Sequence, residues 1–272
     1  MNVRKAIWRG FGALGLDVRR RRSLDQEGPP RGTMAGALRQ LARIGLAPNT
    51  VIDVGAASHT QELYEAFPRS AMLLIEPLVE FEPALRKICA TYDAQYVLAA
   101  AGERSGVATL NVHPGLFGSS LLNEVEGAAV DGTPREVSIV TIDQVCAEKG
   151  LRGPYVIKAD VQGAELQVLA GATQTLRDTE AVILEASLFG FYLGGPQLYD
   201  VISRLKEFGF VAYDIYGFLY RPLDDALSQL DIVFVREESA LRKSHAYATA
   251  KQREGIEREM ARRISAMQRN QA

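Results

Sequence analysis

Short apolar runs alternate with amphipathic segments through the middle of this 272-residue chain. Apolar residues that recur every three or four positions predict five helices, over 33–44, 60–67, 81–91, 164–176 and 196–207. The apolar runs between them predict seven strands, over 50–54, 71–76, 95–100, 155–160, 181–186, 210–215 and 230–235. Continuous apolar strands are typical of a sheet that helices cover on both faces. The pattern therefore predicts an α/β fold with a mostly parallel sheet.

The segment 107–140 interrupts this alternation. Two β-rich pieces, VATLNV and REVSIV, flank a connection rich in Gly, Ser and Asn. This predicts an inserted hairpin with a long loop, and long loops at the mouth of a sheet often carry function. We expect the insertion to belong to one domain that spans residues 32–236.

The two ends of the chain differ from this domain. Residues 1–31 predict a basic amphipathic helix and a Pro/Gly-rich linker, in which Trp8 and Phe11 beside arginines suit a peripheral membrane contact. Docking of that helix on its own domain is the alternative. Residues 237–272 predict a charged helical tail, which is either solvated or pairs in a homodimer. Eighteen consecutive apolar residues occur nowhere, and the N-terminal pattern argues against a cleaved signal peptide.

Composition and charge narrow the function classes. Hydrophobic residues make up 47% of the chain, and the two cysteines, Cys89 and Cys146, form no CxxC pattern. This favours a cytoplasmic protein without a disulfide framework or a zinc site. The net charge is +5 over residues 1–31, +4 over 236–272 and −11 between them. An acidic core repels nucleic-acid phosphates, so no nucleic-acid substrate is expected there.

Ligands of an open α/β sheet lie beyond the carboxyl ends of its strands. The first strand ends in DVGAA, with Asp53, Gly55 and Ala56, and Gly55 allows a ligand to approach the backbone. The second ends in IEP, where Glu76 follows Asp53 by 23 residues, near the interval at which an acidic side chain meets a ribose. The turn lacks GxGxxG, and the chain lacks GxxxxGK[ST], so a phosphate cradle is missing. A nucleoside without phosphate, S-adenosylmethionine, fits this combination, and its ammonium group suits Asp53.

The ordered segments DVGAA, IEPL, YVLAAAGERSG, GSSLL, VTIDQV, VIKADVQGAELQVLAGA, VILEAS and LDIVFVRE extend the comparison over about residues 33–240. In this order they resemble the FkbM-type S-adenosylmethionine-dependent methyltransferases. The resemblance implies a seven-stranded Rossmann-like methyltransferase sheet with an antiparallel last strand, and methylation of a hydroxyl on a sugar or another small natural product. It also implies a set of cofactor-binding residues, namely Asp53, Gly55 and Ala56 for the methionine end, Glu76 and Pro77 for the ribose, Ala100 for the adenine, and Asp160.

Methylation of a hydroxyl also requires a residue near the acceptor that takes up the hydroxyl proton. Asp160, Glu165 and Glu185 follow or begin neighbouring elements, so we expect them to converge at one rim. Asp160 is the first choice for the general base and Glu185 the second. Mg²⁺ could gather the same carboxylates, although no metal ligands are assigned.

Further acceptor contacts are expected from Glu165, Ser119, Ser120 and Tyr192, with His113 as a reserve base. Each has a structural alternative. Glu165 can stabilise the start of its helix, the serines can form a turn, and Tyr192 can be core. In addition, Lys158 can pair with Asp160, and Asp143 can cap a helix after Thr141.

These residues predict an S-adenosylmethionine-dependent O-methyltransferase that acts on a small-molecule or carbohydrate acceptor. Ala57 and His59 stand where many relatives have Asn and Gly, which leaves a non-catalytic binding or scaffold protein as the alternative. A nicotinamide-dependent oxidoreductase is a third interpretation, disfavoured by the missing glycine fingerprint.

Overall fold

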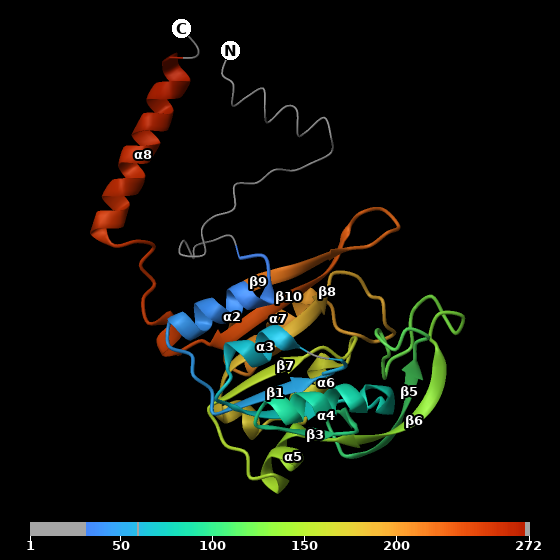
Figure 1. Ribbon diagram of the computed structural model, residues 1–272. Coiled ribbons are helices and arrows are strands. Elements are labelled where there is room, and N and C mark those ends of the chain that lie inside the picture. The colour runs from blue at the N-terminus through green and yellow to red at the C-terminus, as the bar shows by residue number, and fades with distance from the viewer. Residues whose placement is uncertain (1–30, 59, 270–272) are drawn as a thin grey trace. The chain divides into compact units, whose positions relative to one another are not determined.

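The computed structural model describes residues 31–58 and 60–269 (Figure 1). The chain divides into two units at Arg31, and every element described below belongs to the unit that begins at Gly32. The predicted N-terminal helix and the side chain of His59 lie outside the described residues.

A seven-stranded sheet forms the centre of this unit, in the order β3-β2-β1-β7-β8-β10-β9 (Figure 1). Strands β1, β2, β3, β7 and β8 pair in parallel, and β10 runs antiparallel to both β8 and β9. The mostly parallel sheet and its antiparallel last strand confirm the predicted fold class. The strands are β1 Thr50–Val54, β2 Ala71–Ile75, β3 Ala94–Val97, β7 Tyr155–Ala159, β8 Thr179–Ser187, β9 Phe210–Tyr220 and β10 Leu227–Arg236.

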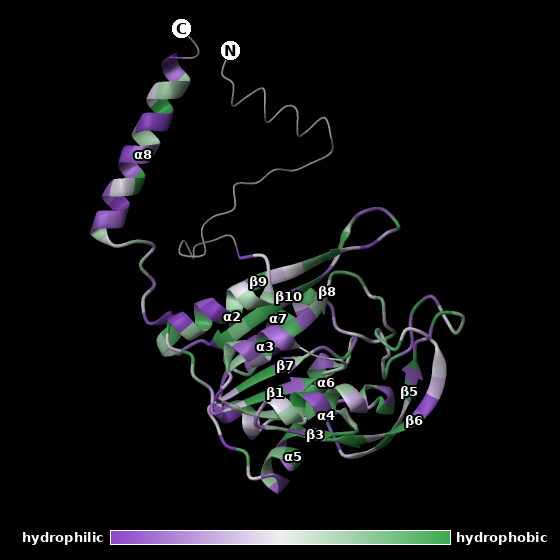
Figure 2. Ribbon diagram, in the orientation of Figure 1, coloured by the Kyte–Doolittle hydropathy of each residue, from purple (hydrophilic) through white to green (hydrophobic). Residues whose placement is uncertain are grey.

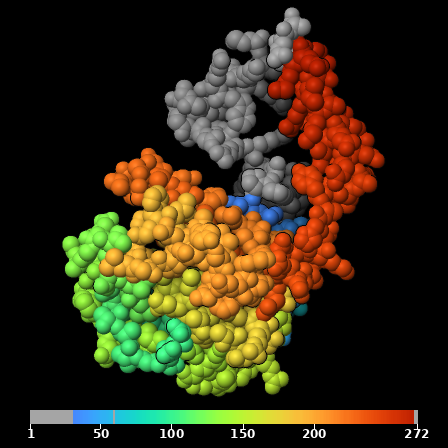
Figure 3. All heavy atoms as spheres, turned by 180° about the vertical axis from the view of Figure 1, so that it is seen from behind, coloured from blue at the N-terminus to red at the C-terminus, as the bar shows by residue number. Residues whose placement is uncertain are grey.

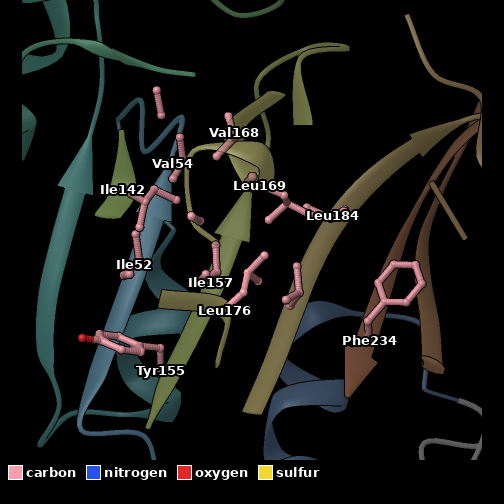
Figure 4. Packing of buried hydrophobic residues seen from close by; sticks show 14 of the residues in the cluster. Ile52, Val54, Ile142, Tyr155, Ile157, Val168, Leu169, Leu176, Leu184 and Phe234 are labelled. Carbon is pink, nitrogen blue, oxygen red and sulfur yellow. The ribbon is translucent and has the colours of Figure 1, made fainter. Parts of the chain in front are cut away.

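Three helices cover each face of the sheet. On one face lie α2 Met34–Arg43, α3 Gln61–Ala66 and α4 Glu82–Thr91, whose buried residues share a core with Val51 and Val156. On the other face lie α5 Ile142–Glu148, α6 Glu165–Ala170 and α7 Leu198–Glu207, which pack with Ile52, Ile157 and Phe234 (Figure 4). All five positions of β1 and of β7 are buried, as expected for strands covered on both faces.

The insertion forms a separate three-stranded sheet in the order β4-β6-β5. Strands β5 Gly106–Val112 and β6 Thr133–Val140 are antiparallel, which confirms the predicted hairpin, and β4 Ala100–Ala101 runs parallel to β6. The prediction of a single strand over 95–100 is wrong at its C-terminal end. Strand β3, which pairs with β2, ends at Val97, and Ala100 and Ala101 form β4, which pairs with β6 of the insertion.

Two other segments differ from prediction. The helix predicted over 164–176 is divided into α6 and the 3-10 turn η2 Thr175–Asp178. Helix α5 begins after Thr141, whose hydroxyl accepts from the Gln144 N–H at 3.1 Å, so Thr141 and not Asp143 is the cap. Asp143 instead accepts hydrogen bonds from the backbone N–H groups of Gln174 and Thr175 and so anchors the start of η2.

The C-terminal segment contains η3 Ala240–Arg242 and the helix α8 Ala250–Arg269, which is red in Figure 3. No residue of α8 is buried, and its surface is mainly hydrophilic (Figure 2). Leu241 belongs to η3 and not to α8. A search of the helices in residues 31–58 and 60–269 finds none with the length and apolar character needed to cross a bilayer.

Candidate active site

A cavity of about 240 Å³ lies at the carboxyl ends of β1, β2 and β7. The sequence-predicted residues that line it are Gly55, Ala56, Glu76, Pro77, Ala100, Ser119 and Asp160. Asp53, Ser120, Glu165, Glu185 and Tyr192 were predicted as site residues and do not line it. Strand ends thus bring together the expected donor-binding residues except Asp53. Of the expected acceptor-side residues, Asp160 and Ser119 line the cavity as well, and the others do not.

Glu76 is buried at the wall of the cavity and is held by backbone groups. Its Oε2 accepts from the Ala57 N–H and its Oε1 from the Leu78 N–H, each at 2.9 Å. Burial raises the pKa of Glu76, and these two hydrogen bonds act in the opposite direction. A carboxylate oxygen has more than one lone-pair site, so each can still accept from a ligand hydroxyl. Glu76 is therefore fixed in orientation and keeps its capacity to bind.

A glycine is required at position 55 because the backbone there lies very close to the backbone of Asp160. The φ of Gly55 is +74°, and a Cβ at this position would lie 2.0 Å from the carbonyl oxygen of Asp160. The turn after β1 is further fixed by the Gly55 N–H, which donates to the Ile75 carbonyl at 2.9 Å. The sequence predicted a glycine that admits a ligand. Gly55 does line the cavity, but the steric requirement comes from the loop after β7.

Asp53 is fully buried beneath the cavity. Its Oδ2 accepts from the Tyr64 hydroxyl at 2.6 Å, and its Oδ1 lies 3.7 Å from the Lys158 ammonium. Within the described part of the chain, Oδ1 has no hydrogen-bond partner. Side chains alternate along a strand, so Asp53 shares the face of Val51, where α2 and α3 pack. The Asp53 carboxylate consequently touches Tyr64 and Lys158 and does not reach the cavity surface.

Lys158 joins Asp53 to Asp160. Its ammonium lies 3.3 Å from Asp160 Oδ2, which confirms the ion pair considered from the sequence. Asp160 also accepts from the Gln162 side-chain amide at 2.9 Å, and its own side chain is 36% exposed at the cavity. Burial acts to lower the pKa of Lys158, but the carboxylates of Asp160, Asp53 and Asp231 outweigh it and raise that pKa to about 12. Lys158 is therefore charged at neutral pH.

Four carboxyl groups, here called the carboxyl cluster, lie near the carboxyl ends of β7 and β8 and interact electrostatically. The cluster consists of Asp160, Glu165, Glu185 and Asp231. Burial raises the pKa of Glu185 to about 8, with further contributions from Asp160, Glu165 and Asp231. Burial raises the pKa of Glu165 to about 7 and that of Asp231 to about 7, and the Asp160 charge adds to both effects. The three carboxyl groups predicted to converge, Asp160, Glu165 and Glu185, thus influence the pKa values of one another. Asp231 is a fourth member, which the sequence did not predict.

Within the cluster, Glu165 has a clear structural task. Its Oε1 accepts from the Val161 and Gly163 N–H groups, both at 3.1 Å, and so fixes the loop between β7 and α6. Glu185 accepts from the Gln229 side-chain amide on β10. Sequence reasoning missed Asp231, which faces Glu185 directly across the β8/β10 pair. An acidic residue inside the apolar run LDIVFV was the available signal.

The remaining predicted acceptor residues make contacts within the chain. The Ser120 hydroxyl donates to the Gln162 carbonyl at 2.7 Å, and the Ser119 hydroxyl donates to the Leu116 carbonyl at 2.6 Å. Tyr192 packs against Gly163, where a Cβ would lie 2.7 Å from its ring, and its hydroxyl is 3.3 Å from the Gln162 side-chain oxygen. His113 Nε2 lies 2.9 Å from Glu124 Oε1 and does not line the cavity.

The apolar wall of the cavity was also missed. It comes from the segment after β2 and from the insertion, and consists of Leu78, Phe81, Leu110, Leu116, Phe117 and Leu121. All of these side chains except Phe117 belong to a small core between the insertion and the main sheet. The apolar positions of the insertion were visible in the sequence, but their proximity to Glu76 depends on long-range packing.

The described residues, 31–58 and 60–269, contain no group of three or more His, Cys, Asp or Glu side chains arranged to hold a metal ion. Nothing in this part of the chain therefore supports the Mg²⁺ that the sequence left open.

Comparisons with solved structures find several methyltransferases at low sequence identity. Magnesium protoporphyrin IX methyltransferase (ChlM) from Synechocystis PCC 6803, solved with bound SAM, is 11% identical. The match covers 87% of this chain and 98% of that chain, with a TM-score of 0.39. The fibrillarin pre-rRNA processing protein of Methanococcus jannaschii is 13% identical, over 70% of this chain and 67% of that chain, with a TM-score of 0.40.

Comparisons of sequence are more specific. The 2-O-methyltransferase NoeI of Sinorhizobium fredii (strain NBRC 101917 / NGR234) is 28% identical over 193 residues, which cover 64% of this chain and 78% of the relative. The family model described as the methyltransferase FkbM domain matches residues 53–212, from the end of β1 into β9. That match spans more than half of the chain, which therefore belongs to the FkbM methyltransferase family.

Proposed function

We propose that this protein is an S-adenosylmethionine-dependent O-methyltransferase whose acceptor is a hydroxyl group of a carbohydrate or another small molecule. The observation that carries the proposal is Glu76, a carboxylate at the cavity wall with both oxygens oriented by backbone N–H groups. The similarity to a 2-O-methyltransferase supports the choice of oxygen as the acceptor atom.

The cavity fits the donor in three respects. Glu76 would hold the two ribose hydroxyls through its remaining lone pairs. Ala100 and Ala101 present small side chains, which leave room for a flat base beside the apolar wall. The turn of Gly55 and Ala56 would lie along the methionine end, while Asp53 would act through Lys158 and not by direct contact.

S-adenosylmethionine, when bound, supplies a methyl group on a positively charged sulfur. The chain then has to hold the acceptor hydroxyl in line at about 3–3.5 Å and accept its proton. Asp160 suits the proton acceptor because its carboxyl group is partly exposed at the cavity and is oriented by Lys158 and by the Gln162 side-chain amide. Glu185, the second choice for the base, does not line the cavity, and burial raises its pKa to about 8.

The first test is donor binding by calorimetry with S-adenosylmethionine and S-adenosylhomocysteine. We expect both to bind the full chain, and Glu76→Ala to weaken both by at least about tenfold through loss of the ribose contacts. Glu103→Ala removes an exposed carboxylate outside the cavity and serves as the control. If wild-type protein binds neither compound at millimolar concentration, the proposed enzymatic function is rejected in favour of a non-catalytic binding or scaffold protein.

The second test addresses the proton acceptor. Asp160→Asn keeps the shape of the side chain and removes its charge, so we expect unchanged donor binding and methyl transfer reduced by about 10²-fold or more. The assay is transfer of a labelled methyl group to a panel of carbohydrate and small-molecule hydroxyl acceptors. Normal turnover by Asp160→Asn would assign the proton to another group.

A further inference from the structure

An exposed aromatic ring stands at the mouth of the cavity. Phe117 lies in the loop between β5 and β6 and is 65% exposed, although it is one of the residues that line the cavity. Its ring contacts Phe81, with centroids 5.4 Å apart and planes at 53°. Phe81 is 8% exposed, so one ring of the pair is fixed in the core and the other faces outward.

The aromatic pair of Phe81 and Phe117 lines the same cavity as the carboxylate of Glu76. Leu78 donates its N–H to Glu76 and lines the cavity, and Phe81 follows within one short 3-10 turn, η1 Val79–Phe81. A ligand whose hydroxyls reach Glu76 would therefore extend its next group between Ala100 and these rings. The wall at that point is aromatic and aliphatic, which suits a flat and uncharged group.

The loop that carries Phe117 is held by specific hydrogen bonds. The Ser119 hydroxyl accepts from the His113 N–H at 3.0 Å and donates to the Leu116 carbonyl, which closes the turn around Phe117. The Ser120 hydroxyl donates to the Gln162 carbonyl at 2.7 Å, which fastens the loop to the segment after β7. The position of the ring is thus defined by contacts outside the ring itself.

The methyl acceptor is less suited than the donor to lie against this apolar wall. None of Tyr192, Glu185 and Asp231 lines the cavity. A sugar beside Phe117 would lie next to Glu76, at the place needed for the ribose.

We propose that Phe117 is a donor-binding residue whose ring, together with that of Phe81, covers the adenine base of S-adenosylmethionine against Ala100. This inference rests on the proposed function and adds to it that the insertion supplies the outer wall of the donor site. Without the insertion, this side of the base would lose the wall formed by Leu110, Leu116, Phe117 and Leu121.

The test compares Phe117→Ala with wild type in the full chain, with S-adenosylhomocysteine and free adenosine as probes. We expect a rise in Kd of about tenfold for both probes, the size typical of removing a ring that stacks on a base. Phe218→Ala is the matched control, because this ring is 52% exposed and lies outside the cavity. Melting temperatures of both variants should stay close to wild type, since both rings are mainly exposed.

The outcomes separate the two proposals. If Glu76→Ala weakens binding of S-adenosylhomocysteine while Phe117→Ala changes neither probe, the inference is overturned and the proposed function stands. A loss for S-adenosylhomocysteine without a loss for adenosine would place the ring at the amino-acid end, which also overturns it. If wild-type protein binds neither probe, both proposals fail together.

Discussion

The cavity and the carboxyl cluster lie at the same edge of the sheet but satisfy their charges in different ways. In the cavity, Glu76 is compensated by two backbone N–H groups and surrounded by apolar walls. In the cluster, Asp160, Glu185 and Asp231 interact with the Lys158 ammonium group, and Glu165 accepts from two backbone N–H groups. Backbone dipoles are fixed by the fold, whereas most of the cluster depends on one ammonium group. The cavity should therefore tolerate changes of neighbouring side chains, and the cluster should not.

The sharpest way to break this comparison is to remove Lys158. Lys158→Met leaves Asp53 and Asp160 without their cation in a buried setting, and we expect a loss of about 3–5 kcal/mol in the free energy of unfolding. The measurement is denaturant unfolding at pH 7. Lys206→Met is the control, because Lys206 pairs with Glu237 at the surface and such pairs contribute about 0–1 kcal/mol. Equal losses in both variants would show that the cluster does not depend on this lysine.

An intermediate effect should come from pH. The pKa values of Glu185, Glu165 and Asp231 are raised to about 8, 7 and 7, so the folded state holds protons that the unfolded chain releases near pH 4. Stability should therefore be highest near pH 5 and fall as pH rises to about 8, by on the order of 1–3 kcal/mol. Glu185→Gln and Asp231→Asn should each flatten this fall in melting temperature.

The control for the pH series is Glu237→Gln, which removes an exposed carboxylate outside the cluster. Its melting temperature should follow the wild-type dependence between pH 5 and 8. A fall that persists unchanged in the Glu185→Gln and Asp231→Asn variants would mean that these carboxyl groups are already ionised across this range.

The smallest expected effect concerns the insertion. Arg135 on β6 pairs with Glu80 in η1 at 2.8 Å, and both side chains are partly exposed. Arg135→Met should lower the free energy of unfolding by less than about 1 kcal/mol. If the insertion forms the outer wall of the cavity, the same variant should weaken S-adenosylhomocysteine binding by a few-fold, as measured by calorimetry. A change in stability without any change in binding would separate the insertion from the donor site.

Much of the fold could be predicted from the sequence because buried parallel strands are continuous apolar runs. The predicted bounds of β1 agree with the structure, and β2 and β7 are each shorter by one residue. The strand ends then located Gly55 and Glu76 at one cavity. The helix over 164–176 failed because Gly171 interrupts it, at a point where a Cβ would lie 2.0 Å from the Gly102 carbonyl oxygen.

The chemistry of individual side chains was harder to predict. The sequence places Asp53 at a strand end. It does not show whether the side chain faces the cavity or, as in the structure, Tyr64 of α3. Asp231 is remote from Glu185 along the chain, and only the register of β8 with β10 brings them opposite one another. Pairings of this kind depend on tertiary structure, which local patterns of apolar residues do not encode.

The insertion hairpin forms its own small sheet with β4 and shares no ladder with the seven central strands. Its loop can therefore gain or lose residues without shifting the register of β2 or β7, the strands after which Glu76 and Asp160 follow. Exchange of the rim as a module should leave the residues beneath it in place as long as the hydrogen bond from Ser120 to Gln162 is kept.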